Sequence, residues 1–234
     1  MRRLLLIRHG LPDYRVRAAG DEIPGPPLSA LGCAQARQAA AVVARAPVAT
    51  VYSSPLSRTR MTAELIAATI ARPVRVAVDL REWHRSETLH AVGARLARWL
   101  VGWLRGREEC AAVVSHASPL LALLRTALYL PHVGWWRPGR PEALELSSGD
   151  RFEVTMASVF ELTFTPARVS ARGLFHPEPR IHHLARGRHH RGLPRPVPGL
   201  GENRVVERPN WLRLLGAAGC LGSGVCPSLP LGLG

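Results

Sequence analysis

Short apolar runs alternate along this chain with longer segments of helical periodicity, and this alternation constrains the fold more than any other feature. The first run, Leu4–Ile7, is continuously apolar, as expected of a strand that is covered on both faces. Further strands are predicted at residues 48–52, 74–78, 111–115, 154–164 and 169–175. Helices are predicted at residues 29–45, 56–70, 88–104 and 120–130. Repeated strand–helix alternation predicts an α/β fold, a three-layer sandwich with a mostly parallel central sheet and helices on both faces.

The chain changes character after about Leu184. Apolar residues make up 47% of the 234 residues, enough for one sizeable core. Residues 185–234 are instead dominated by Arg, Gly, Pro and His, with few large apolar side chains. Such a composition buries too little surface to offset the entropy of ordering. We therefore expect one folded domain at residues 1–184 and a disordered Arg/Gly/Pro-rich tail at residues 185–234.

The formal net charge is +14, and every basic residue apart from histidine is arginine. The absence of lysine excludes Schiff-base chemistry on lysine and a phosphate-binding loop of the Walker type. The excess of arginine has two interpretations. One is codon bias combined with solubility, and the other is attraction to an anion, either phosphate or nucleic acid. The positions of individual arginines must decide between them.

Neither the cysteines nor the terminal segments of the sequence indicate a secreted or membrane-bound protein. None of the four cysteines has C-x-x-C spacing, so no zinc site or redox motif is predicted, and a cytoplasmic setting is expected. The apolar run at the N-terminus stops at Arg8, which is too short for a signal peptide. Residues 214–234 carry no charge, but their glycines and prolines argue against a spanning helix. No membrane partner is expected.

Arg8, His9 and Gly10 follow directly after the first predicted strand. In open α/β sheets, ligands bind beyond the carboxyl ends of the strands. A neutral imidazole there can act as a nucleophile, and the planar fork of a neighbouring arginine can bind phosphate oxygens. Gly10 allows the main chain to turn sharply. Alone, this three-residue match is a weak signal.

Two further residues occupy equivalent places. Arg58 lies in the first turn of the helix after strand 48–52, where main-chain N–H groups also favour anions. His116 follows strand 111–115, and a protonated histidine beside a phosphate would stabilise developing negative charge. Taken singly, Arg58 would be interpreted as a solvent-exposed arginine and His116 as a structural histidine. Three such elements in one chain favour a phosphate site.

Together these segments resemble the histidine phosphatase (phosphoglycerate mutase-like) superfamily. The resemblance includes P-L-S-A-L-G-C-A-Q-A at residues 27–36, similar to the family's L-T/S-x-x-G-x-x-Q-A. It also includes S-S-P-L-x-R at residues 53–58 and V-S-H-A at 114–117. A-S-V at 157–159 and H-L at 183–184 are similar to the closing strands of the family. The motifs occur in the family order over residues 1–184, which are expected to form the catalytic domain.

The resemblance implies a phosphomonoester hydrolase that needs neither metal nor cofactor. His9 would be the phosphorylated nucleophile, while Arg8, Arg58 and His116 would bind the phosphoryl group. The expected partner is a small-molecule phosphate ester. The loops at 20–27 and 134–150 carry no motif that identifies this ester, and the sequence carries no signal for the oligomeric state.

The general acid/base is expected in an L-x-E segment, which matches Leu80 to Glu82. Glu82 would protonate the leaving alcohol and then activate water, with Glu87 as its rival. After R-H-G, many family members have W-N where this chain has Tyr14 and Arg15, so Arg15 is expected to add a phosphate contact. A further departure is Met156, which stands where asparagine commonly precedes the A-S-V.

Three alternatives remain open at this point. A mutase would return the phosphoryl group to its substrate, but the short segment after Glu82 leaves little room for the insertion of glycolytic mutases. A silent module for phosphate or acidic partners would not need all four phosphate-site residues. Nucleic-acid binding by the tail is disfavoured because the tail lacks interleaved aromatic residues. The histidine pairs at 182–183 and 189–190 lack further ligands in a fixed frame and are interpreted as incidental.

Overall fold

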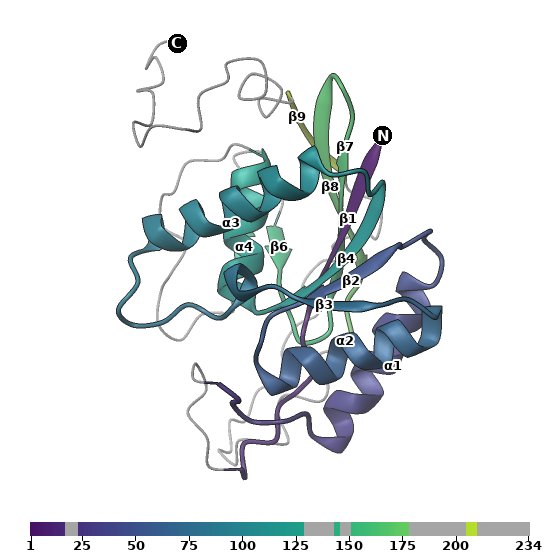
Figure 1. Cartoon of the computed structure of the whole chain (residues 1–234), viewed down its shortest axis with the longest axis vertical. Coiled ribbons are helices and arrows are strands. Elements are labelled where there is room, and N and C mark those ends of the chain that lie inside the picture. The colour runs from purple at the N-terminus through teal and green to yellow at the C-terminus, as the bar shows by residue number, and fades with distance from the viewer. Residues whose placement is uncertain (17–22, 129–142, 146–150, 178–204, 210–234) are drawn as a thin grey trace, which may run out of the picture.

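The computed structural model describes residues 1–16, 23–128, 143–145, 151–177 and 205–209 (Figure 1). The histidine pairs at 182–183 and 189–190 and most of the loop at 134–150 lie outside these residues. Among the described residues, no three His, Cys, Asp or Glu side chains gather as a metal-binding group would require. None of the described helices combines the length and apolar character of a membrane span.

Within the described residues, seven strands form the main sheet, in the order β3-β2-β4-β1-β7-β8-β9. They are β1 (Arg2–Arg8), β2 (Thr50–Ser53), β3 (Val74–Val76), β4 (Cys110–Ser115), β7 (Val159–Phe164), β8 (Arg168–Phe175) and β9 (Val205–Pro209). The four strands β1 to β4 are parallel to one another, whereas the pairs β1–β7, β7–β8 and β8–β9 are antiparallel. Two short strands, β5 (Ala143–Glu145) and β6 (Arg151–Glu153), form a separate hairpin.

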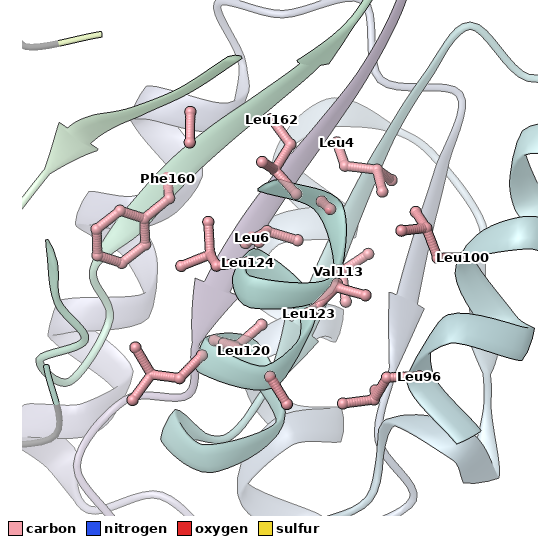
Figure 2. Close-up of a cluster of buried hydrophobic side chains, with 14 of the residues drawn as sticks. Leu4, Leu6, Leu96, Leu100, Val113, Leu120, Leu123, Leu124, Phe160 and Leu162 are labelled. Carbon is pink, nitrogen blue, oxygen red and sulfur yellow. The ribbon is translucent and has the colours of Figure 1, made fainter. Parts of the chain in front are cut away.

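In the part of the chain that the structure describes, the α-helices cover both faces of the sheet, with α1 (Ala30–Val43) and α2 (Ser57–Ile70) on one face and α3 (Leu89–Arg105) and α4 (Ala117–Leu128) on the other (Figure 1). Side chains alternate along β1, so Leu4 and Leu6 enter one core and Leu5 and Ile7 the other. The first core packs against α3 and α4, and Figure 2 shows their leucines around β1. The second packs against α1 and α2. The predicted three-layer sandwich is confirmed.

Local signals explain where the helices begin. Ser29 caps α1 by accepting a hydrogen bond from the N–H of Gly32, and Thr88 caps α3 through the N–H of Ala91. Helix α4 begins at Ala117, three residues before the predicted start at residue 120. Pro119 is tolerated there because N–H groups of the first turn have no partner within the helix. The early start places His116 directly before the helix.

Strand β9 comes from the segment expected to be a disordered tail. It pairs antiparallel with β8 from Arg168 to Arg172, and Arg168 forms an ion pair with Glu207 at 2.6 Å. The structure therefore departs from the expectation of disorder at residues 205–209, because an open sheet edge offers main-chain partners that composition does not reveal. The rest of residues 185–234 lies outside the described residues.

Candidate active site

The carboxyl ends of three neighbouring parallel strands meet at one edge of the sheet. His9 follows β1, Ser54 follows β2 and His116 follows β4, the strand between them. Main-chain hydrogen bonds continue past the strand ends, from His9 N to Ser115 O at 3.1 Å and from Ser54 N to Val114 O at 3.0 Å. The register of the sheet thus fixes the three side chains side by side.

Two glycines allow the main chain after β1 to contact the first turn of α1. A Cβ atom on Gly10 would lie 2.3 Å from the carbonyl oxygen of Gly32, and one on Gly32 would lie 2.1 Å from that of Leu11. The buried side chain of Gln35 accepts a hydrogen bond from Leu11 N at 2.9 Å. The R-H-G and L-G-x-x-Q segments are therefore two halves of one close packing contact.

Arg58 joins the two histidines. Its Nε donates to His9 Nε2 at 3.1 Å, and its Nη2 lies 3.1 Å from His116 Nδ1. The two imidazole rings meet edge to face, with centroids 5.1 Å apart. His9 Nδ1 lies 2.7 Å from the carbonyl oxygen of Gly10. Since Nε2 accepts from Arg58, Nδ1 carries the proton and donates to Gly10, which leaves the Nε2 lone pair as the nucleophilic position.

Glu82 completes the cluster from the segment that follows η1, a short helix at Val78–Leu80. One carboxylate oxygen lies 3.5 Å from His116 Nδ1 and 4.0 Å from Arg58 Nη2. Its other oxygen accepts a hydrogen bond from Trp83 N at 2.9 Å. The side chain remains 24% exposed, so a proton can pass between this carboxyl group and water.

The segment before β7 holds Arg8. The guanidinium of Arg8 donates to the carbonyl oxygen of Val154 at 2.6 Å, and Ala157 N donates to His9 O at 3.1 Å. Ala157 has a φ of 56°, which is unusual outside glycine, and Met156 beside it is buried. Among the residues that the structure describes, none accepts a hydrogen bond from the buried Nε of Arg8. This N–H remains available to a ligand oxygen.

Burial and nearby positive charge lower the pKa of both histidines. For His9, burial lowers the pKa well below 6.5, and Arg8 and Arg58 lower it further. For His116, burial again comes first, followed by His9, Arg58 and Arg8. Both rings are therefore neutral at neutral pH, whereas the expectation for His116 was a protonated ring beside a bound phosphate. A phosphate dianion among these cations would oppose the shift, because negative charge favours the protonated ring.

Two residues expected at the site lie elsewhere or have another partner. The Arg15 side chain is 89% exposed and pairs with Asp13 through both of its carboxylate oxygens. The structure thus does not bring Arg15 to the cluster. The Glu87 carboxylate binds Arg81 and Arg95 rather than either histidine. Of the two candidate carboxylates, only Glu82 faces His116 and Arg58 in the described structure.

Sequence reasoning gave no role to Ser54, which lies in the S-S-P-L-x-R segment, or to Thr62, which follows that segment. Ser54 Oγ lies 2.9 Å from His116 Nε2 and is fully buried. Thr62 Oγ1 accepts from Gly10 N at 3.2 Å and donates to the carbonyl oxygen of Arg58 at 2.7 Å. Thr62 lies one turn after Arg58 on α2, so helical spacing would have indicated that the two share a face.

Comparisons with known proteins agree with this geometry. A model of the histidine phosphatase superfamily (branch 1) matches residues 4–87. Glucosyl-3-phosphoglycerate phosphatase of Mycobacterium tuberculosis is 34% identical over an alignment of 134 residues, and the match covers 53% of this chain and 60% of that protein. The chain thus spans three fifths of the length of the curated relative that it matches.

Solved structures extend the likeness over more of the chain. A mycobacterial glucosyl-3-phosphoglycerate phosphatase in complex with VO3 has a TM-score of 0.55 and 25% identity, covering 70% of this chain and 91% of that one. An Escherichia coli protein described as a putative alpha-ribazole-5'-P phosphatase has the same fold, with a TM-score of 0.58 and 19% identity over 70% and 92% of the two chains. With its motifs in the family order and its strand ends forming one cluster, the chain is similar to the histidine phosphatase superfamily.

Proposed function

We propose that this chain hydrolyses phosphate monoesters through a phosphohistidine intermediate on His9. The observation that carries this proposal is the position of Arg58, which contacts His9 Nε2 and His116 Nδ1 at 3.1 Å each and has Glu82 within 4.0 Å. Nucleophile, phosphate-binding cation and carboxylate therefore lie within one phosphate group's reach of each other.

In the first step, His9 Nε2 attacks phosphorus while the ester P–O bond breaks. The carboxylic acid form of Glu82 donates its proton to the leaving alkoxide, which departs as a neutral alcohol. Arg8, Arg58 and His116 bind the phosphoryl oxygens. Phosphoryl transfer depends mainly on positioning and charge stabilisation, and these three groups supply both.

In the second step, the Glu82 carboxylate removes a proton from water as the water oxygen attacks phosphorus. The P–N bond breaks, inorganic phosphate leaves and Glu82 is again protonated. The proton on His9 Nδ1 stays in its hydrogen bond with Gly10 throughout, so the ring keeps one orientation.

The proposed substrate is a small-molecule phosphate ester, and the proposed compartment is the cytoplasm. The curated relative is named as a glucosyl-3-phosphoglycerate phosphatase, a name that denotes a phosphate ester with an alkyl leaving group. Hydrolysis is favoured over mutase chemistry because only residues 83–88 separate Glu82 from α3, which leaves no room for a long insertion.

A panel of phosphate monoesters tests the activity, with glucosyl-3-phosphoglycerate at its head and inorganic phosphate release as the measurement. His9→Ala should abolish release, while the matched control His176→Ala changes an exposed histidine and should retain it. Turnover by His9→Ala equal to that of the unsubstituted protein would contradict the proposal. Return of the phosphoryl group to an added alcohol in place of water would favour the mutase.

A further inference from the structure

Glu82 lies on an irregular segment, unlike the other groups of the site. The segment at residues 79–87 runs from η1 to the cap of α3, and strand pairing does not fix it. Ser115 Oγ donates to the carbonyl oxygen of Leu80 at 2.6 Å, which attaches the start of the segment to the end of β4. This bond is made by the start of the segment, before Glu82.

Arg95 holds the segment from the side of α3. This arginine is only 4% exposed, and Val92 and Leu96 on either side of it pack into the core. Its guanidinium donates to the main-chain carbonyl oxygens of Asp79 and of Glu82, the latter at 3.3 Å. The two carbonyl groups flank the turn that presents the Glu82 carboxylate to His116.

The same guanidinium also binds the far end of the segment. Arg95 Nε donates to one oxygen of Glu87 at 3.1 Å, and Nη2 lies 3.3 Å from the other. Glu87 in turn accepts from His84 N at 3.2 Å and from Arg81. Burial opposes ionisation of Glu87, but Arg95, the His84 N–H and Arg81 together lower its pKa below the ordinary value. The carboxylate is therefore ionised and paired at neutral pH.

We propose that Arg95, together with Glu87, is the positioning residue for the general acid/base Glu82. Arg95 acts through the main chain of residues 79–87, and its hydrogen bonds described here go to that segment alone. The inference rests on the proposed function, in which Glu82 protonates the leaving alcohol. Only a planar fork can serve two carbonyl groups and a carboxylate at once, so lysine at this position keeps the charge but not the geometry.

The chain supplies a matched control one turn further along α3. Arg98 also forms an ion pair with the segment, from Nη2 to Asp79 Oδ1 at 3.5 Å, but its side chain is 70% exposed. Arg98→Lys therefore makes the same substitution on the same helix without disturbing a buried network. Exposed pairs of this kind contribute little.

The test compares kcat/KM for two esters, para-nitrophenyl phosphate and glycerol phosphate. The aryl ester needs little protonation to leave, whereas the alkyl ester needs the acid. The ratio of the two values does not depend on the folded fraction, because misfolded protein lowers both equally. Arg95→Lys should lower kcat/KM for the alkyl ester by about 10–100-fold and for the aryl ester by less than about threefold, as expected when general-acid catalysis worth roughly 10²–10⁴ is partly lost. Arg98→Lys should leave the ratio unchanged.

The Glu82→Gln variant tests the role of Glu82 itself, separately from the positioning role of Arg95. In that background, Arg95→Lys should produce no further change in the ratio, because the group that it positions is already gone. Equal losses on both esters in Arg95→Lys, beside a strongly selective loss in Glu82→Gln, would overturn the positioning role and leave the function intact. Equal losses in Glu82→Gln would overturn the role of Glu82 and this inference together.

Discussion

The phosphate-binding cluster and the segment at residues 79–87 are built in different ways. His9 and His116 follow adjacent parallel strands, and the register of the sheet fixes their separation. Glu82 lies on an irregular segment whose position depends on side chains, above all on Arg95 of α3. The comparison teaches that, in the proposed mechanism, binding of the phosphoryl group depends on the sheet, whereas acid/base chemistry depends on one buried ion-pair network.

The largest effect on activity is expected for substitutions in the phosphate-binding cluster. It would sharpen the contrast between this cluster and the segment at residues 79–87. Arg58→Ala and His116→Ala should each lower kcat/KM by about 10²–10³, since each removes one preorganised donor to the phosphoryl group. Unlike Arg95→Lys, they should lower it for aryl and alkyl esters alike. Steady-state kinetics with both esters provides the measurement.

Arg60→Ala is the control for these two variants. Arg60 lies on the same helix as Arg58 but is exposed and pairs with Glu64 at 3.6 Å. Its replacement should leave kcat/KM nearly unchanged. Losses below tenfold in both Arg58→Ala and His116→Ala, or an equal loss in Arg60→Ala, would place the phosphate site elsewhere.

A second, smaller effect concerns stability in acid. The folded state holds His9 and His116 neutral with lowered pKa values, whereas the unfolded chain protonates them below about pH 6.5. Acid therefore favours the unfolded state, and the stability that the folded state has above pH 6.5 is lost as the pH falls below it. For two histidines, the free energy of unfolding should fall by about 2–3 kcal/mol between pH 7.5 and 5.5.

Urea denaturation at the two pH values measures this loss. The His9→Gln/His116→Gln variant provides the comparison, because glutamine does not titrate and its pH dependence should be smaller by the same amount. If both proteins lose equal stability between pH 7.5 and 5.5, the histidines are not held neutral by burial and by the arginines.

The smallest effect is expected at Arg15, the residue that motif comparison placed at the phosphate. Its guanidinium is exposed and bound to Asp13, so Arg15→Ala should change kcat/KM by less than about twofold, as is usual for exposed ion pairs. Steady-state kinetics with a phosphate ester measures this change in kcat/KM. A loss comparable to that of Arg58→Ala would show that Arg15 leaves Asp13 to contact the substrate.

The same division explains what could be predicted from the sequence. The continuously apolar run Leu4–Ile7, the caps Ser29 and Thr88, and the residues that follow each strand are local signals. Topology then places His9 and His116 together without further information. The layers of the fold and the strand-end part of the site follow from such signals.

Features that depend on contacts between distant segments could not be predicted in this way. Nothing local to Arg95 distinguishes it from the exposed Arg98 three residues later, because burial and the pairing with Glu87 exist only in the folded chain. Strand β9 likewise depends on the open edge of β8 rather than on its own composition. The pairing of Arg15 with Asp13 is a local contact, but motif alignment does not show it either.

Rapid quench of the reaction with an ester labelled in its phosphoryl group tests the central claim most directly. The account predicts an acid-labile, base-stable phosphoryl adduct that forms within one turnover, maps to His9 and is absent in His9→Ala. It should accumulate further in Glu82→Gln with an aryl ester, because water then lacks its general base while the first step survives. A label on another residue, or turnover with no covalent adduct at any quench time and undiminished rate in His9→Ala, would contradict the account.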